Sequence, residues 1–287
     1  MPATFWFLSL AATALWWPRD LAGIAARYIW TLPALAAIGF AVVEGFMNGT
    51  GLAIVLALAA AAAYAHHGSH SVVRRLAHAY VLAVTTGLFL HVLPGFSNPV
   101  VIDHVVLSPG AVSYTQYLNV DKGLAGLLLL GLYVPERVQK DRGPRPLLAS
   151  LARFLVVVAA AIAVALATGY LRWDPKLPSW WPMWLGIMLV LTALPEEAAF
   201  RGVVHSTLAE RRSDPRSVLA IVVGGLLFGV AHIAGGPVYV LVSAVAGIGY
   251  GWIYASTGSI AAAILAHAGL NTIHLLLFTY PSLAVSP

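Results

Sequence analysis

The chain has 287 residues, of which 60% are hydrophobic and 9% charged, and it contains no cysteine. Soluble domains carry about 25% charged residues and about 45–50% apolar ones, so this composition excludes an ordinary soluble domain and a disordered chain. The lack of cysteine excludes a disulfide scaffold, a cysteine nucleophile and a cysteine-ligated metal. The net charge of +5 comes from basic residues scattered among apolar runs, which does not indicate a nucleic-acid partner. With a mean hydropathy of +0.85, the chain is predicted to be a multi-pass membrane protein.

Apolar runs recur along the whole chain and are separated by short polar or Pro/Gly-marked turns. A membrane-spanning helix needs about 17–25 residues. Runs of this kind predict helices at 3–17, 28–47, 50–66, 72–93, 122–134, 147–170, 181–208, 216–233, 236–256 and 258–280. The first and fifth are short, which favours tilted, re-entrant or interfacial helices there. We therefore predict an all-α, polytopic transmembrane helical bundle with about 8–10 membrane helices. The 94–121 connection is expected to be an ordinary loop, with a lid over the outer surface as the alternative.

Ionisable residues inside the apolar runs are concentrated in the last third of the chain. Charged groups at bilayer depth are costly, so such residues are functional candidates. Three groups on separate predicted helices stand out: Glu196 and Glu197 with Arg201, Phe228 with His232, and His267 with Asn271.

Helical spacing predicts which way these side chains point. Glu197 and Arg201 are four residues apart, so they share a helix face and can pair. Glu196 is rotated by about 100° from its neighbour. One carboxylate can therefore be neutralised by Arg201 while the other points elsewhere. His267 and Asn271 are also four residues apart and share a face.

This set of groups suits the activation of water. A carboxylate in an apolar cavity can act as a general base, and a histidine from another helix can hold the water. A second histidine and an asparagine amide can donate hydrogen bonds to a developing oxyanion. Taken singly, the groups have plainer interpretations: a structural Glu–Arg ion pair, a core histidine, and an asparagine that joins helices. Their joint presence on three apolar helices favours a peptide-hydrolysing site.

The motifs Glu-Glu-x-x-x-Arg, Phe-x-x-x-His and His-x-x-x-Asn occur in this order at 196–201, 228–232 and 267–271. In that order they resemble the CPBP family of intramembrane proteases, which includes the type II CAAX prenyl endopeptidases and the bacterial Abi proteins. The resemblance spans roughly 181–280. It implies a glutamic endopeptidase whose catalytic membrane domain is 181–280. The N-terminal transmembrane region, 1–170, is not covered by the motifs and is expected to contribute to substrate selection.

The resemblance also implies a role for each motif residue. Glu196 is the catalytic base and acts with His232 on water, while His267 and Asn271 form the oxyanion site. Glu197 and Arg201 support the site structurally. No cofactor is expected; zinc held by the same Glu and His residues is the less favoured alternative.

The implied partners are a protein or peptide substrate at the membrane and the lipid bilayer, without nucleic acid. The location is the plasma (inner) membrane if the source is bacterial. Two other functions stay open. The first is a membrane transporter whose buried ionisable groups form a proton relay. The second is a non-catalytic immunity or scaffold protein of the same family.

Overall fold

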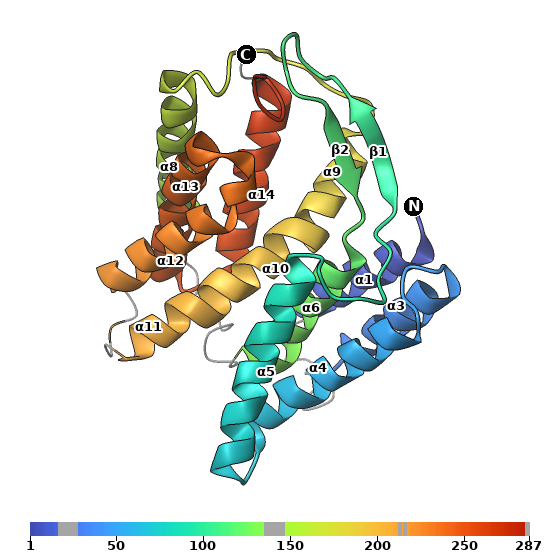
Figure 1. Ribbon diagram of the computed structural model, residues 1–287. Coiled ribbons are helices and arrows are strands. Elements are labelled where there is room, and N and C mark those ends of the chain that lie inside the picture. Colours follow the sequence, from blue (N-terminus) through green and yellow to red (C-terminus); the bar gives the residue numbers. More distant parts are fainter. Residues whose placement is uncertain (17–27, 135–146, 212–213, 215–216, 285–287) are drawn as a thin grey trace. The chain divides into compact units, whose positions relative to one another are not determined.

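The computed structural model describes residues 1–16, 28–134, 147–211, 214 and 217–284 (Figure 1). The chain forms two compact units. The first comprises Met1–Val101, Tyr117–Pro135 and Gly186–Glu196, and the second Ile102–Gln116, Glu136–Leu185 and Glu197–Pro287. Helices dominate both units, which confirms the all-α fold class. The division into 1–170 and 181–280 concerned function and stays a prediction.

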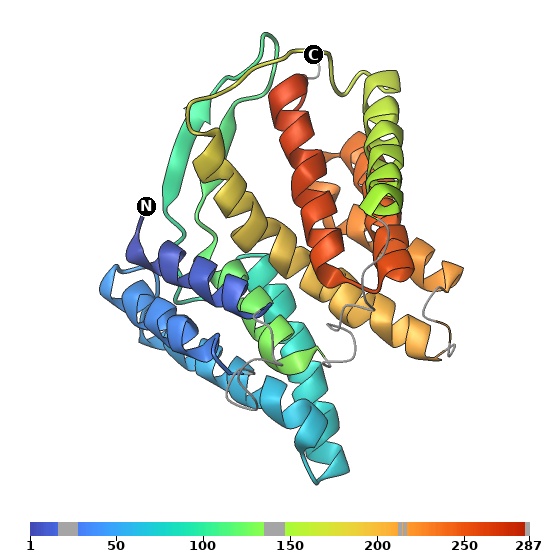
Figure 2. The same ribbon diagram turned by 180° about the vertical axis from the view of Figure 1, so that it is seen from behind.

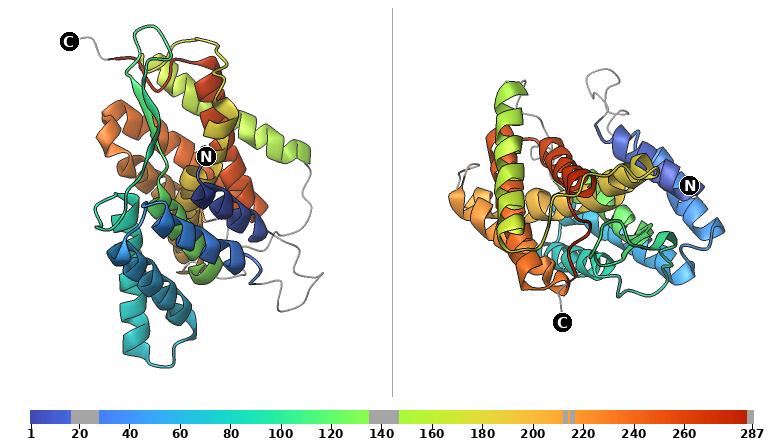
Figure 3. Two further views of the ribbon diagram at one scale, coloured as in Figure 1. Left: turned by 90° about the vertical axis from the view of Figure 1, so that its right-hand side faces the viewer. Right: turned by 90° about the horizontal axis from the view of Figure 1, so that it is seen from above.

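The first unit is built from pairs of packed helices. Its helices are α1 (Ala3–Ala14), α3 (Thr31–Val43), α4 (Gly49–His67), α5 (Ser71–Phe89) and α6 (Val120–Leu128), the last extended by the π-helical stretch η2 (Leu129–Tyr133). Helix α1 packs on α3, and α4 and α5 form a hairpin (Figures 1 and 3). Glu44, directly after α3, accepts hydrogen bonds from Ala3 N at 2.7 Å and Thr4 Oγ1 at 2.6 Å. It thereby satisfies donors at the start of α1 that have no partner within the helix.

The second unit has α13 at its centre. Its elements are α8 (Leu147–Ala167), α9 (Trp181–Ile187), η4 (Ala198–His205), α11 (Ser206–Arg211), α12 (Val218–Ala231), the 3₁₀ turn η5 (Ile233–Gly235), α13 (Pro237–Thr257) and α14 (Ile260–Leu277). Helix α13 contacts α8, α12 and α14, and α8 lies beside α14 in Figure 2.

The helix that carries the two glutamates is irregular around them. From Trp181 to Arg211 the elements α9, η3 (Met188–Ala193), α10 (Leu194–Glu197), η4 and α11 follow one another without a break. Pro195 has no N–H for the carbonyl of residue 191, and its ring crowds that carbonyl. The chain is π-helical on both sides of the turn that holds Pro195. Widened turns of this kind are frequent at functional sites.

Apolar helices of two lengths fit a membrane protein. Within the described residues, four are long and apolar enough to cross a bilayer: Ala149–Ala167, Trp181–Glu210, Pro237–Thr257 and Ile260–Leu277. Four more are apolar but shorter: Ala3–Ala14, Thr31–Val43, Gly49–Ala65 and Val218–Ala231. With its 14 residues, α12 is about 21 Å long, less than the hydrocarbon thickness of about 30 Å. The protein is an integral membrane protein.

Helices α12 and α13 approach each other at their backbones. A Cβ atom on Gly225 would lie 2.5 Å from the Ile248 nitrogen, and one on Gly229 would lie 2.7 Å from the Val240 carbonyl oxygen. Small residues four apart allow such close packing in membranes. The contact seats the end of α12, which carries two of the motif residues, directly on α13.

The 94–121 connection is more ordered than a simple loop. It contains the strands β1 (Val100–Val105) and β2 (Tyr114–Tyr117), which pair in a two-stranded sheet. The β-branched run of β1 and the Pro109-Gly110 turn that follows are signals of such a pair.

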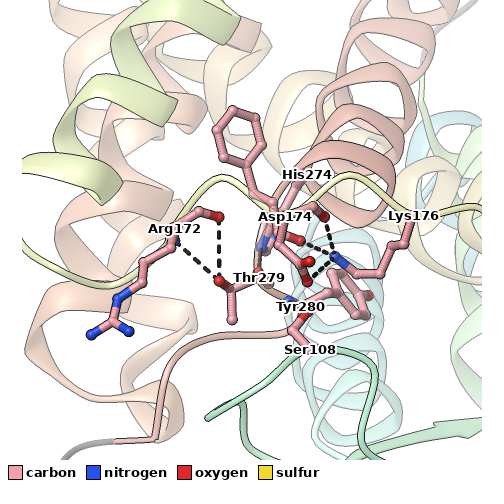
Figure 4. A network of polar contacts seen from close by, with 8 residues as sticks. Ser108, Arg172, Asp174, Lys176, His274, Thr279 and Tyr280 are labelled. Atoms are coloured by element: carbon pink, nitrogen blue, oxygen red, sulfur yellow. Dashed lines mark hydrogen bonds and ion pairs between the residues drawn. The ribbon is translucent and has the colours of Figure 1, made fainter.

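A polar network holds the end of α14 (Figure 4). Lys176 Nζ donates to Asp174 Oδ2 at 3.1 Å and to the carbonyl of Phe278, directly after the helix. Tyr280 N donates to Ser108 Oγ at 3.2 Å, which ties in the segment before β2. The hydrogen bond with Ser108 and, secondarily, the Lys176 ammonium hold the pKa of Asp174 below its usual value. The network therefore fixes α14 at the end that follows its motif residues.

Candidate functional site

A buried ionic cluster in the second unit joins two of the three motif groups. Glu197 is 0% exposed, Arg201 2% and His267 3%. Arg201 Nη1 donates to Glu197 Oε1 at 3.2 Å and lies 3.1 Å from Oε2, an ion-pair contact without hydrogen-bond alignment. His267 Nδ1 is 3.0 Å from Glu197 Oε1. The Glu197–Arg201 pair predicted from helical spacing is therefore confirmed, and α14 adds a partner to it.

Arg201 also contacts two other helices, α12 and α13. Its Nη2 donates to the carbonyl of Gly247 on α13. The guanidinium carbon lies 5.2 Å from the ring centre of Phe228 on α12 and 5.5 Å from that of Tyr250 on α13. The His267 ring stacks on Tyr250 with centroids 4.8 Å apart and an interplanar angle of 14°. The helices of all three motifs thus meet around one guanidinium group.

The contact with Glu197 fixes the direction of the proton on His267. A carboxylate only accepts hydrogen bonds, so His267 Nδ1 carries the proton and donates it to Glu197. Nε2 can then donate a second bond only if the ring is an imidazolium, whose charge the carboxylate balances. Asn271 follows one turn later on α14, on the same face.

His232 lies at the end of α12, as expected from the predicted helix 216–233. It is the C-cap residue after Ala231, and its side chain is partly exposed. Nδ1 donates to the Phe228 carbonyl at 2.7 Å, since a carbonyl can only accept. In the neutral ring, Nε2 is then the acceptor nitrogen. Tyr239 packs edge-on against the ring, with centroids 5.2 Å apart.

Glu196 belongs to the first unit and has a different partner from Glu197. Its Oε1 accepts a hydrogen bond from Lys122 Nζ at 2.6 Å, and the two side chains are 9% and 13% exposed, respectively. The sequence predicted that the two neighbouring carboxylates point in different directions, and they do have different cationic partners, Lys122 and Arg201. Convergence of Glu196 with the two motif histidines and Asn271 stays a prediction.

Lys122 had no role in the sequence-based prediction. It lies in the first turn of α6, whose glycines allow a close approach to the helix of the glutamates. A Cβ atom on Gly123 would lie 2.4 Å from Leu191 Cδ2, and one on Gly126 would lie 2.4 Å from Pro195 Cα. The sequence does contain a signal for this contact. Lys122 stands at the start of an apolar segment, and glycines follow it one and four positions later.

The cluster around Glu197 does not fit a zinc ion. The carboxylate already contacts a guanidinium and a histidine N–H, both of which oppose a divalent cation at the same oxygens. Across the described part of the chain, no group of three or more His, Asp or Glu side chains is arranged to hold a metal. Independence from metal stays a prediction.

Comparison with known families agrees with the motifs. Residues 178–273, which are 96 of the 287, match the family described as "Type II CAAX prenyl endopeptidase Rce1-like". The matched segment includes every residue from Glu196 to Asn271. No curated protein and no solved structure matches the chain. Over this third of the chain, the protein is therefore similar to the type II CAAX prenyl endopeptidases, and the similar segment contains all three motifs.

Proposed function

We propose that this protein is an intramembrane glutamic endopeptidase that hydrolyses a peptide bond of a membrane-associated protein or peptide without a metal. Glu196 and His232 activate water, and His267 and Asn271 stabilise the oxyanion. The observation that supports this best is the buried Glu197–Arg201–His267 cluster, because it fixes the ring of a motif histidine and directs its Nδ1–H to Glu197.

Water activation uses two acceptors. The neutral His232 ring, with Nδ1–H donated to the Phe228 carbonyl, offers Nε2 to a water hydrogen. Glu196 takes the other proton as the water oxygen attacks the scissile carbonyl carbon. The protonated Glu196 then gives this proton to the leaving amine when the tetrahedral intermediate collapses. General base catalysis of this kind contributes about 10²–10⁴-fold to the rate.

Oxyanion stabilisation uses two donors. The His267 imidazolium donates Nδ1–H to Glu197 and Nε2–H to the oxyanion, and the Asn271 amide donates the second bond. Arg201 holds the Glu197 carboxylate in place. In other hydrolases, removal of one oxyanion donor costs about 10²–10³-fold in kcat.

The family match supports a protein or peptide substrate at the membrane. The proposed chemistry acts on the peptide bond of the substrate and does not specify a prenylated C-terminus. If the source is bacterial, we place the enzyme in the plasma (inner) membrane, with the 1–170 region contributing to substrate selection.

The test compares three forms of the full-length protein: wild type, Glu196→Gln, and Glu210→Gln as control. Glu210 is exposed and lies on the same long helix. Proteins released from the membrane of cells expressing each form are compared, and the cleavage products are then followed in liposomes. We expect Glu196→Gln to lose at least about 100-fold in rate, with Glu210→Gln unchanged. A folded Glu196→Gln protein that cleaves like wild type contradicts the proposal.

Two further measurements separate the alternatives. Activity is expected to survive strong chelators; loss with chelator and recovery with zinc supports the metal-dependent version. Proton flux in liposomes that stops in Glu196→Gln, in the absence of any cleavage, supports the transporter.

A further inference from the structure

We propose that Lys122 is a positioning residue for Glu196, holding its carboxylate ionised and in one orientation. The inference rests on the proposed role of Glu196 as the base. It begins from the 2.6 Å hydrogen bond between Lys122 Nζ and Glu196 Oε1, in which both side chains are largely buried. Nothing in the three motifs assigns a function to this lysine, which lies 74 residues before Glu196.

The backbone, and not only the flexible lysine side chain, sets this contact. Gly126 is four residues after Lys122 and so lies on the same face of α6. At Gly126, any Cβ atom would lie 2.4 Å from Pro195 Cα, so α6 touches the backbone directly before Glu196. The packing of α6 against the segment before Glu196 therefore places Lys122 beside the Glu196 carboxylate.

The first turn of α6 is itself fixed by a buried carboxylate. Asp121 Oδ2 bonds His91 Nδ1 at 2.8 Å, and its Oδ1 accepts from Asn98 Nδ2 at 3.0 Å and from the Lys122 backbone N–H at 2.7 Å. Asn98 Oδ1 in turn accepts from Val120 N at 2.9 Å. These bonds tie the start of α6 to the end of α5. They leave Lys122 little freedom to move away from its partner.

The chemistry of the pair suits a general base. A carboxylate that leaves bulk water stays ionised only if an opposite charge pairs with it. The Lys122 ammonium supplies that charge at Oε1. The proton from water then goes to the Glu196 carboxylate, and Lys122 keeps its own three protons throughout. The Phe89 ring, 5.7 Å from Nζ, adds a further favourable contact for the charged lysine.

The test measures kcat and KM separately for full-length Lys122→Met, Lys122→Arg and the control Lys176→Met. Lys176 matches Lys122 in being 13% exposed and paired to a carboxylate. We expect Lys122→Met to lose about 100-fold in kcat, the size of loss that a small misplacement of a reacting group causes, with KM little changed. Lys122→Arg, which keeps the charge, is expected to stay within about 10-fold of wild type. Lys176→Met is expected to keep kcat.

Each outcome separates this inference from the proposed function. If Glu196→Gln is inactive while Lys122→Met keeps the wild-type kcat, the role of Lys122 is wrong and the role of Glu196 stands. If Glu196→Gln keeps the wild-type kcat, the proposed function fails and this inference with it. The folded fraction of each variant is measured by size-exclusion chromatography. A kcat loss in Lys122→Met that only follows the folded fraction, or that arginine does not restore, shows a structural role and overturns the inference.

Discussion

Replacement of Arg201 by methionine tests the buried cluster directly. The change keeps a long apolar side chain but removes the guanidinium that contacts Glu197, the Gly247 carbonyl and two aromatic rings. Glu197, which is 0% exposed, is left with His267 as its partner in the cluster. A carboxylate in that position cannot recover the lost interaction from water.

The expected loss of stability is large. Removal of one partner of a buried ion pair costs about 3–5 kcal/mol, and the loss of ring contacts to a desolvated cation adds up to about 2 kcal/mol. The hydrogen bond from His267 offsets part of this cost, because Glu197 keeps one buried donor. We therefore expect about 4 kcal/mol of destabilisation. At about 2–4 °C per kcal/mol, this corresponds to a fall of about 8–16 °C in the unfolding midpoint.

The assay is thermal unfolding in detergent at one heating rate, with the fraction of monodisperse protein as the readout. Arg172→Met removes an exposed arginine and is the control, expected to change stability by less than about 0.5 kcal/mol. The double variant Glu197→Gln/Arg201→Met removes both charges and is expected to be more stable than Arg201→Met alone. A fall of less than about 3 °C in Arg201→Met, or a double variant no more stable than the single one, refutes the reasoning.

Two further predictions concern packing and pH. Gly126→Ala places a methyl group against the Pro195 backbone and is expected to destabilise the protein by about 1–3 kcal/mol. Gly39→Ala, where nothing lies within 4 Å of the added atom, is expected to be neutral or slightly stabilising by the same unfolding measurement. Asp174, whose pKa is lowered in the folded state, stabilises the protein above its unfolded-state pKa and loses this effect as the pH falls through the folded-state pKa. Asp174→Asn should therefore flatten the acid side of the stability profile, and an unchanged acid side contradicts that assignment.

Features set by neighbouring residues could be predicted from the sequence. Every apolar run predicted as a helix contains a helix in the described residues. The Glu197–Arg201 pair, and the fact that Glu196 does not share it, followed from 3.6 residues per turn alone. The end of α12 lies within two residues of the predicted end at 233, and Gly236, with φ of +87°, and the proline after it are ordinary signals of a helix end.

Features set by tertiary packing could not be predicted in this way. The bond from His267 to Glu197 joins residues 70 apart, and that from Lys122 to Glu196 joins residues 74 apart. No periodicity indicates which helices become neighbours. Pro195 marks an irregular turn in the sequence, but whether the helix kinks, ends or widens into π-helix depends on what packs beside it.

Two consecutive carboxylates in an apolar helix would repel each other if both stayed ionised without partners. Here each has a cation of its own, and the two cations differ in a way that matches the proposed roles. Arg201 makes a planar group of contacts with Glu197 and the α13 backbone, which suits a fixed support. Lys122 bonds Oε1 of Glu196 through a single ammonium group, which suits a carboxylate that takes up and releases a proton. Arginine can therefore replace lysine at 122, where only one charged donor is needed. Lysine cannot replace Arg201, because a single ammonium cannot reach Glu197 and Gly247 together.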